Sequence, residues 1–257
     1  MNGSLIKIQL ETKNLNIEEQ KSNFLLMPRH RIISDLVLKY CGKKEEIVDI
    51  GCGNTCGQLL YLQDQGYENL SGVDFNITTA FKDINLIEQD LEEPLKTAIG
   101  YDAAILADVI EHSRYPRLIL KNALNNIRVD GLIFLSVPNA GHFYNGILLT
   151  LLPRHLNMSS AFGPWGHYSF LTYYSLKKLF EVFDLEIVEF KGSSLEFRYM
   201  SMHWTKRAAM WVINIVPVLL NFGFFRKYFS DHLYFVLRKK NNNFLRLDDK
   251  IIYEANI

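Results

Sequence analysis

The hydrophobic residues of this chain fall into two kinds of pattern, which alternate along it. Short runs of apolar residues predict buried strands, and apolar residues that recur at helical spacing predict amphipathic helices. The predicted strands are Ile47–Ile50, Asn69–Asp74, Asn85–Asp90, Tyr101–Asp108, Leu132–Val137, Leu185–Phe190 and His232–Leu237. The predicted helices are Pro28–Tyr40, a segment from Leu59 to Gly66, a segment from about Tyr115 to Ile127, and Thr172–Phe183.

Strands that alternate with helices and are apolar along most of their length are typical of a parallel sheet covered on both faces. The chain therefore predicts an α/β fold with a doubly wound sheet. In such sheets, ligands bind beyond the carboxyl ends of the strands. Four acids lie at or near those ends, Asp49, Asp74, Asp90 and Asp108. These acids either belong to a ligand site or are unrelated residues that face solvent.

A glycine-rich turn follows the first strand and precedes a helix. Gly51 and Gly53 allow a sharp turn and a close approach of the backbone to a ligand, because neither has a Cβ atom. The spacing to Gly57 is G-x-G-x-x-x-G, whereas dinucleotide sites usually have G-x-G-x-x-G. Asp49 interrupts an otherwise apolar strand. Its carboxylate suits a ligand with a cationic end, or it could brace the loop by accepting backbone N–H groups.

Composition narrows the function classes. The chain has 257 residues, of which 48% are hydrophobic, and its 28 basic and 28 acidic residues cancel. No basic surface is therefore expected to attract nucleic acid. The three cysteines, Cys41, Cys52 and Cys56, are too few for a disulfide framework and fit a reducing, cytoplasmic setting. Because Cys52 and Cys56 have no second pair of ligands in sequence, we expect no metal site. The N-terminus shows no signal peptide.

The patterns predict one domain over residues 1–257, with its core motifs in 28–190. Two segments, 139–171 and 192–230, are predicted to be insertions that cap the site, and residues 239–257 are predicted to be a loose tail.

One stretch of the second insertion, residues 208–225, carries no charged side chain and is flanked by basic residues. A spanning helix here would place the last two strands on opposite sides of a membrane, although both should join one sheet. We therefore interpret the stretch either as a helix or hairpin on a membrane surface, or as a buried cap or dimer contact. The first interpretation would place the protein at the inner face of the membrane.

Five motifs together resemble class I S-adenosylmethionine-dependent methyltransferases, in order and in spacing. They are Val48–Gly53, Gly72–Asp74, Gln89–Leu91, Ala107–His112 and Ser136–Asn139. The Asp-Val-Ile-Glu-His segment and the segment from Gly166 to Phe180 resemble the sub-group that includes the ubiquinone-type O-methyltransferases. The resemblance covers about residues 28–190 and implies a Rossmann-like, seven-stranded, mostly parallel sheet whose last strand is antiparallel.

The resemblance implies S-adenosyl-L-methionine as cofactor and assigns residues to it. The residues implied to bind it are Asp49, Gly51, Cys52, Gly53, Asp74, Phe75, Asp90, Leu91, Ala107 and Asp108. Asp49 and the glycines would face the methionine part, and Asp74 the ribose hydroxyls. Asp90 and Leu91 would line the adenine, and Ala107 and Asp108 would lie beside the methionine part. The family usually has a third glycine two residues after Gly53, where this chain has Thr55.

Methyl transfer to a hydroxyl or an amine also requires a base, and histidine suits this role near neutral pH. His112 is the first candidate, because it ends the Asp-Val-Ile-Glu-His segment at the rim of the predicted cleft. His167 is the second and His142 the third. Each could instead only hydrogen-bond the backbone and shape its loop. We assign no role to His30, His155, His203 or His232, which lie away from the predicted strand ends.

The sequence thus predicts an enzyme that methylates a small or lipid-linked acceptor, with oxygen as the expected acceptor atom. Two alternatives stay open. The first is a methyltransferase-like scaffold without activity, which Thr55 and the apolar insertions would explain. The second is a nicotinamide-dependent oxidoreductase, because Asp74 follows the glycine turn at the distance expected of a ribose-binding acid. The Asp-Val-Ile-Glu-His segment and the glycine spacing count against the second.

Overall fold

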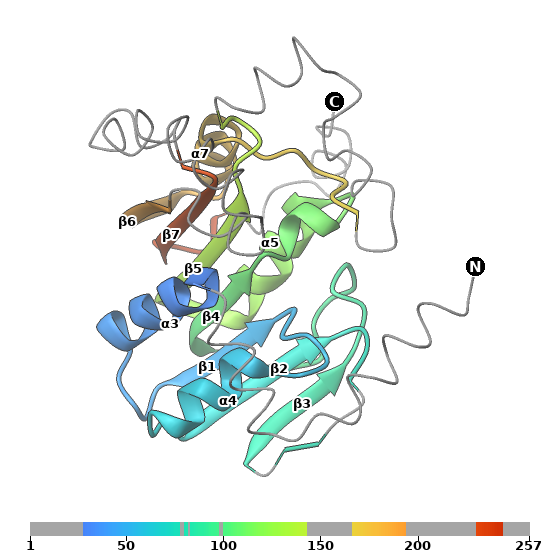
Figure 1. Ribbon diagram of the computed structural model, residues 1–257, viewed down its shortest axis with the longest axis vertical. Helices are drawn as coiled ribbons and strands as arrows, with labels where there is room; N and C mark the ends of the chain where they lie inside the picture. Colours follow the sequence, from blue (N-terminus) through green and yellow to red (C-terminus); the bar gives the residue numbers. More distant parts are fainter. Residues whose placement is uncertain are drawn as a thin grey trace, which may run out of the picture.

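The structure, a computed structural model, describes residues 28–77, 80–81, 83–97, 100–142, 166–193 and 230–243 (Figure 1). Its helices are α3 (Pro28–Tyr40), α4 (Gly57–Asp64), the short 3₁₀ helix η1 (Ile110–His112), α5 (Pro116–Asn126) and α7 (Tyr173–Val182). Its strands are β1 (Glu46–Ile50), β2 (Asn69–Asp74), β3 (Ile84–Glu88), β4 (Tyr101–Ala107), β5 (Ile127–Pro138), β6 (Leu185–Ser193) and β7 (His232–Lys239).

The seven strands form one sheet in the order β3-β2-β1-β4-β5-β7-β6. All neighbouring pairs from β3 to β5 are parallel, and β7 runs antiparallel to both β5 and β6. This arrangement confirms the predicted sheet with its antiparallel last strand. The order reverses between β1 and β4, which is where an open parallel sheet leaves room for a ligand beyond its carboxyl edge.

Helices cover both faces of the sheet, which confirms the doubly wound arrangement (Figure 1). Successive side chains of a strand point to opposite faces. On β1, Ile47 packs in the core beneath α3 and α4, whereas Val48 and Ile50 pack in the core beneath α5 and α7. Asp49 alternates with Val48 and Ile50, so it shares the face of Ile47 and points toward the side of α3 and α4.

A strand glycine allows α4 to pack close to the sheet. A Cβ atom at Gly72 of β2 would lie 2.7 Å from Leu59 Cδ1 and 2.8 Å from Leu86 Cδ2. A side chain at this position would force the side chains of Leu59 and Leu86 to shift. The glycine turn directly precedes α4. The close packing of α4 on the sheet therefore brings this turn close to β2.

The start of one strand differs from the prediction for a local reason. Strand β5 begins at Ile127, directly after α5, and not at Leu132. Its pairing with β4 shifts register between Tyr101 and Ala103, and Asp130 adopts a left-handed conformation with φ +66°. Asp130 and Gly131 therefore form an irregularity within one continuous strand.

The predicted loose tail is wrong at its first residue. Lys239 ends β7 and is only 3% exposed. Its ammonium group donates hydrogen bonds to the carbonyl oxygens of Leu124 at 2.7 Å and Ile127 at 2.6 Å. Leu124 lies in the last turn of α5 and Ile127 directly follows the helix, where carbonyl groups lack internal donors and a cation is favourable. Burial nevertheless lowers the pKa of Lys239.

Much of both predicted cap segments lies outside the described residues, including 143–165, 194–229 and therefore the stretch 208–225. Within the part of the chain that the structure describes, no helix is both long enough and apolar enough to span a bilayer.

Lys239→Met keeps most of the apolar stem of the side chain but removes its three donors. We expect the free energy of unfolding to fall by about 1–3 kcal/mol, because the two carbonyls at the end of α5 lose their donor. Urea denaturation of the variant and the parent protein measures the difference. Lys240→Met, at an exposed position, is the control and should change little. Equal stability of Lys239→Met and Lys240→Met would contradict this capping role.

Candidate functional site

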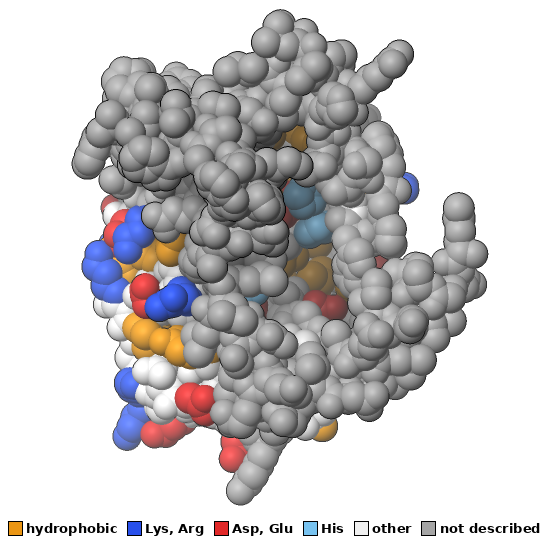
Figure 2. Space-filling view, viewed as in Figure 1, with side chains coloured by type: hydrophobic (Ala, Val, Ile, Leu, Met, Phe, Trp, Pro, Cys, Tyr) orange, Lys and Arg blue, Asp and Glu red, His pale blue; other side chains and the backbone are white. Residues whose placement is uncertain are grey.

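One cavity of about 1060 Å³ lies at the carboxyl edge of the sheet. Of the four acids that the sequence places near this edge, Asp74, Asp90 and Asp108 line the cavity. Figure 2 shows histidine side chains within a hollow on this face of the molecule. All four acids thus lie at or near the carboxyl ends of strands, as predicted, but Asp49 does not line the cavity.

The glycine turn forms one wall of the cavity. Gly51 has φ +87°, and a Cβ atom there would lie 2.4 Å from Val109 Cγ2, so both its conformation and its surroundings require glycine. Its amide donates to the carbonyl of Val73 at 2.7 Å. The Gly53 amide donates to Asp74 Oδ2 at 2.9 Å, and no atom of the described residues lies within 4 Å of the position where a Cβ atom would be. The backbone at Gly53 is thus open to a ligand.

Asp74 is a buried carboxylate at the end of β2, only 7% exposed. Burial raises its pKa, and the backbone amides that donate to it, from Gly53 first and then Asn76, act in the opposite direction. Phe75 follows it and exposes 62% of its surface while lining the cavity. The carboxylate can accept hydrogen bonds from a polyol. The exposed aromatic ring beside it can pack against an apolar ring of the same ligand.

The next wall is the loop after β3, which carries Asp90 and Leu91. Its backbone is held by polar side chains instead of regular structure. The Gln89 amide donates to the carbonyl of Pro94 at 2.7 Å, and Asn122 of α5 donates to the carbonyl of Leu91 at 2.8 Å. Asp90 itself is exposed at the rim. The loop therefore presents a fixed edge to the cavity although it has no helical or strand structure.

The side chains of Asp49 and Cys52, both expected to face a ligand, do not line the cavity. Asp49 is 3% exposed, in the interior of β1. Burial, and secondarily the charge of Asp74, raises its pKa to about 8. Cys52 is 8% exposed, and its sulfur lies 3.8 Å from that of Cys56. Both side chains are buried beneath the glycine turn and do not reach the cavity wall. Contact with a ligand would therefore have to come through the neighbouring backbone.

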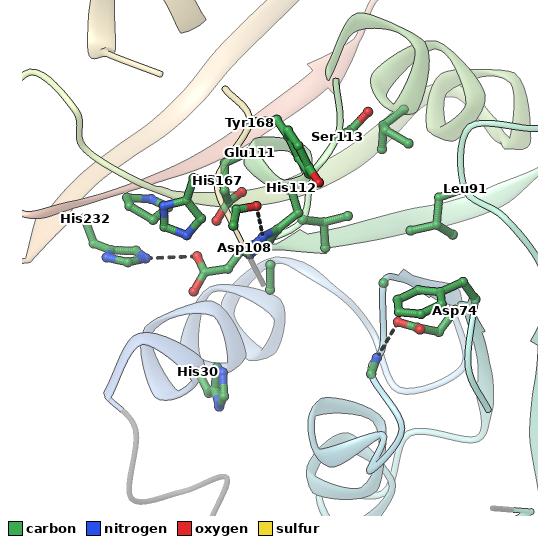
Figure 3. Close-up of a pocket in the computed structure, with 18 of the residues that line it drawn as sticks. His30, Asp74, Leu91, Asp108, Glu111, His112, Ser113, His167, Tyr168 and His232 are labelled. Atoms are coloured by element: carbon green, nitrogen blue, oxygen red, sulfur yellow. Dashed lines mark hydrogen bonds and ion pairs between the residues drawn. The ribbon is translucent and has the colours of Figure 1, made fainter. Parts of the chain in front are cut away.

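The opposite wall of the cavity carries His112 and His167 (Figure 3). Their rings lie 4.8 Å apart in an edge-to-face arrangement, and His112 Nδ1 is 3.2 Å from the carbonyl oxygen of Gly166. The carbonyl of Glu111 accepts the amides of Tyr168 at 2.9 Å and Ser169. These backbone bonds join η1 to the segment before α7, and they bring together two histidines that are far apart in sequence.

The third histidine candidate, His142, is 3% exposed and is absent from the cavity wall. Two histidines to which the sequence assigned no role, His30 and His232, do line the cavity, which corrects that assignment. His232 is the first residue of β7, and its Nε2 lies 2.9 Å from Asp108 Oδ1. No local pattern reveals this pair, because the two residues meet only when β7 returns beside β5.

One group of side chains has the chemistry of metal ligands. Glu111, His112 and His167 place one ligand atom each within 4.8 Å of one another. Ligands of a tetrahedral zinc ion lie about 3.4 Å apart, given bonds of about 2.1 Å. The three side chains would therefore have to move closer together to bind such an ion, and we assign no metal to them.

Comparison with known proteins identifies a family. The model of the family described as "Methyltransferase domain" matches residues 26–190. No curated protein matches the chain.

Solved structures share the fold at low sequence identity. A SAM-dependent methyltransferase from Archaeoglobus fulgidus is 19% identical, with a TM-score of 0.51 over 82% of this chain and 94% of that one. A SAM-dependent methyltransferase from Methanosarcina mazei is 15% identical, with a TM-score of 0.54 over 80% of this chain and 98% of that one. The 1,6-didemethyltoxoflavin-N1-methyltransferase of Burkholderia thailandensis, solved with its substrate and S-adenosylhomocysteine, is 14% identical, with a TM-score of 0.52 over 83% and 79% of the two chains.

The raised pKa of Asp49 predicts a pH-dependent stability. The folded protein holds this proton up to about pH 8, whereas an ordinary aspartate loses it near 3.8. The stability that results is complete below the unfolded pKa and is lost as the pH rises through the folded pKa. Asp49→Asn cannot ionise, so its stability relative to the parent should rise by a few kcal/mol between pH 5 and pH 8.5, since a tenfold difference in proton affinity between the two states corresponds to about 1.4 kcal/mol.

Urea denaturation of both proteins at the two pH values measures this difference. Asp64→Asn, an exposed acid on α4, is the control and should follow the parent. Parallel pH dependence of Asp49→Asn and the parent would show that Asp49 titrates normally in the folded protein.

Proposed function

The chain belongs to the methyltransferase-domain family, in the S-adenosylmethionine-dependent class to which its motifs point, and from this premise we propose that it methylates a small or lipid-linked acceptor at oxygen. The observation that carries the proposal is a single cavity in which the glycine turn and Asp74 lie on one side and histidines on the other. The family and the fold expected from the five motifs are confirmed by the match over residues 26–190 and by the sheet order. The ubiquinone-type sub-group stays a prediction.

The cofactor is proposed to lie along the edge formed by β1, β2 and β4. Asp74 accepts hydrogen bonds from the ribose hydroxyls, while the exposed ring of Phe75 and the fixed loop at Asp90 and Leu91 enclose the adenine. The methionine part extends toward Gly51 and Gly53, and reaches Ala107 and Asp108 at the end of β4. Support comes from the position of Asp74: it already accepts the Gly53 amide, so the turn and the ribose site form one unit.

Asp49 has an electrostatic role in this proposal, although its side chain does not line the cavity. The cofactor brings a positively charged ammonium group and a sulfonium. A nearby cation favours the ionised form of a carboxylic acid, and the pKa of Asp49 lies near 8 without one. Asp49 therefore holds its proton at neutral pH and can release it when the cofactor binds.

The cavity has room for more than a cofactor. Its volume of about 1060 Å³ lies at the upper end of the range of ligand sites, which extends from about 300 to 1000 Å³. The Burkholderia neighbour, which shares the fold, carries a small-molecule substrate beside S-adenosylhomocysteine. We therefore place a small acceptor in the remaining space, next to His112 and His167. Contact of residues 208–225 with a membrane or a lipid-linked acceptor stays a prediction.

His112 and His167 are the proposed catalytic residues that contact the acceptor. The Gly166 carbonyl orients the ring of His112 through Nδ1, which leaves Nε2 for a second partner. The reaction is an in-line displacement, so alignment and close approach are the main contributions a protein can make, worth up to about 7–11 kcal/mol in favourable cases. Two imidazole rings packed at 4.8 Å can hold a hydroxyl in such an alignment.

Asp74→Ala tests the cofactor site. We expect calorimetric titration to show that its affinity for S-adenosylhomocysteine is roughly 10- to 100-fold below that of the parent, because hydrogen bonds to a charged group contribute about 1.5–3 kcal/mol. Circular dichroism should show a retained fold. Asp64→Ala is the control, and NADH replaces S-adenosylhomocysteine as the ligand control. Unchanged affinity of Asp74→Ala would misplace the ribose site, and preferential binding of NADH would favour the oxidoreductase.

His112→Ala and His167→Ala test the acceptor side. Each should lower transfer of a tritiated methyl group from S-adenosylmethionine into the small molecules of a source-cell extract, and the affinity for S-adenosylhomocysteine should stay within a few-fold. Misplacing the reacting groups by about 1 Å can cost about 10²-fold in rate. Transfer at the parent rate by both variants would remove the two histidines from the acceptor site. Cofactor binding by the parent without transfer to any fraction would favour the inactive scaffold.

A further inference from the structure

A carboxylate–histidine pair occupies the cavity beside the proposed methionine site. His232 Nε2 is 2.9 Å from Asp108 Oδ1, and the Ser136 hydroxyl donates to the same oxygen at 2.7 Å. The side chains of Asp108 and His232 are 14% and 15% exposed, so each is largely shielded from solvent yet lines the cavity. Figure 3 shows the pair on the same side of the cavity as His167 and Glu111.

Three strands build this pair. Asp108 follows β4, Ser136 lies in β5, and His232 begins β7, where it pairs with Pro138 of β5 and Ser193 of β6. Asp108 has φ +56°, a left-handed conformation that aspartate adopts more readily than most residues, and its amide donates to the Ser136 carbonyl at 3.0 Å.

The hydrogen bond to Asp108 determines the chemistry of the imidazole. With Nε2–H donated to the carboxylate, neutral His232 carries its lone pair on Nδ1 and can accept a proton there. The same logic orders a base and its orienting carboxylate in hydrolase triads. His112, by comparison, is oriented by the carbonyl of Gly166, which has no full charge to stabilise an imidazolium.

We propose that His232, held by Asp108, removes the proton of the acceptor during methyl transfer, an inference that rests on the function proposed above. The carbon–sulfur bond of the cofactor breaks with its electron pair moving to sulfur. The acceptor oxygen forms the new bond to the methyl carbon, and its proton passes to Nδ1 of His232. His112 and His167 hold the acceptor while this happens.

This assignment also explains why a carboxylate is useful beside a cationic cofactor. An anion that stabilises only the sulfonium favours the ground state and slows the reaction. In the proposed step, the positive charge leaves sulfur and arises on the imidazole, which is in hydrogen-bond contact with Asp108. Asp108 therefore stabilises the charge that develops, and Ser136 keeps the accepting oxygen in place.

The tautomer of His232 can be measured without an acceptor. Isotope-labelled histidine in the full chain with S-adenosylhomocysteine bound should show, by NMR, neutral His232 protonated at Nε2 and unprotonated at Nδ1. Asp108→Asn should weaken this preference, and Arg238→Gln, on the same strand, should not. Protonation of neutral His232 at Nδ1 in the parent protein would overturn the proposal, because the ring would then have no proton acceptor available.

Chemical rescue separates a proton acceptor from a structural residue. His232→Gly should lower transfer of tritiated methyl groups into extract acceptors by roughly 10²–10⁴-fold, with affinity for S-adenosylhomocysteine within about three-fold of the parent. Added imidazole should restore part of the rate in His232→Gly and have no effect on Arg238→Gln.

The two proposals fail in different ways. A parent protein that binds no S-adenosylhomocysteine would overturn the proposed function. A parent protein that binds and transfers, together with a His232→Gly variant that transfers at the parent rate or is not rescued by imidazole, would overturn the role of His232 alone.

Discussion

The hydrogen bond from the Gly53 amide to the Asp74 carboxylate joins the glycine turn after β1 to the end of β2. It depends on the parallel pairing of the two strands, in which Asp49 lies opposite Gly72. It also depends on the missing side chain of Gly72, which allows Leu59 of α4 to pack against the sheet. The cavity wall on this side is therefore a product of backbone geometry, and the ligand meets a surface arranged before it binds.

Burying the ionised forms of Asp49 and Asp74 is unfavourable when no cation lies nearby. Burial raises the pKa of both Asp49 and Asp74, and their mutual repulsion raises the pKa of Asp49 further. A cationic ligand relieves this cost, which links the charge of S-adenosylmethionine to the chemistry of the turn. Asp108 is arranged differently, because His232 and Ser136 of the protein itself donate to it. At one end of this edge, Asp49 and Asp74 would be stabilised by a cationic ligand. At the other end, Asp108 accepts hydrogen bonds from His232 and Ser136.

The acceptor side is assembled from distant segments. The carbonyl of Glu111 accepts the amides of Tyr168 and Ser169, and this joins η1 to the chain that precedes α7. His232 is the first residue of β7, which follows residues 194–229 in the sequence, and these lie outside the described residues. The acceptor side of the cavity therefore depends on long-range contacts, whereas the glycine turn and Asp74 come from adjacent strands.

The sequence by itself determined the sheet, its two covered faces and the glycine turn, because strand periodicity and the carboxyl ends of parallel strands are local features. The strand ends also pointed to Asp74, Asp90 and Asp108, and the motifs that resemble methyltransferases pointed to His112 and His167. All five residues line one cavity. Only the tertiary structure decided that Asp49 lies behind the cavity, that Lys239 is buried beneath α5, and that His232 pairs with Asp108. These three outcomes depend on which strands become neighbours, and no local pattern of residues specifies that.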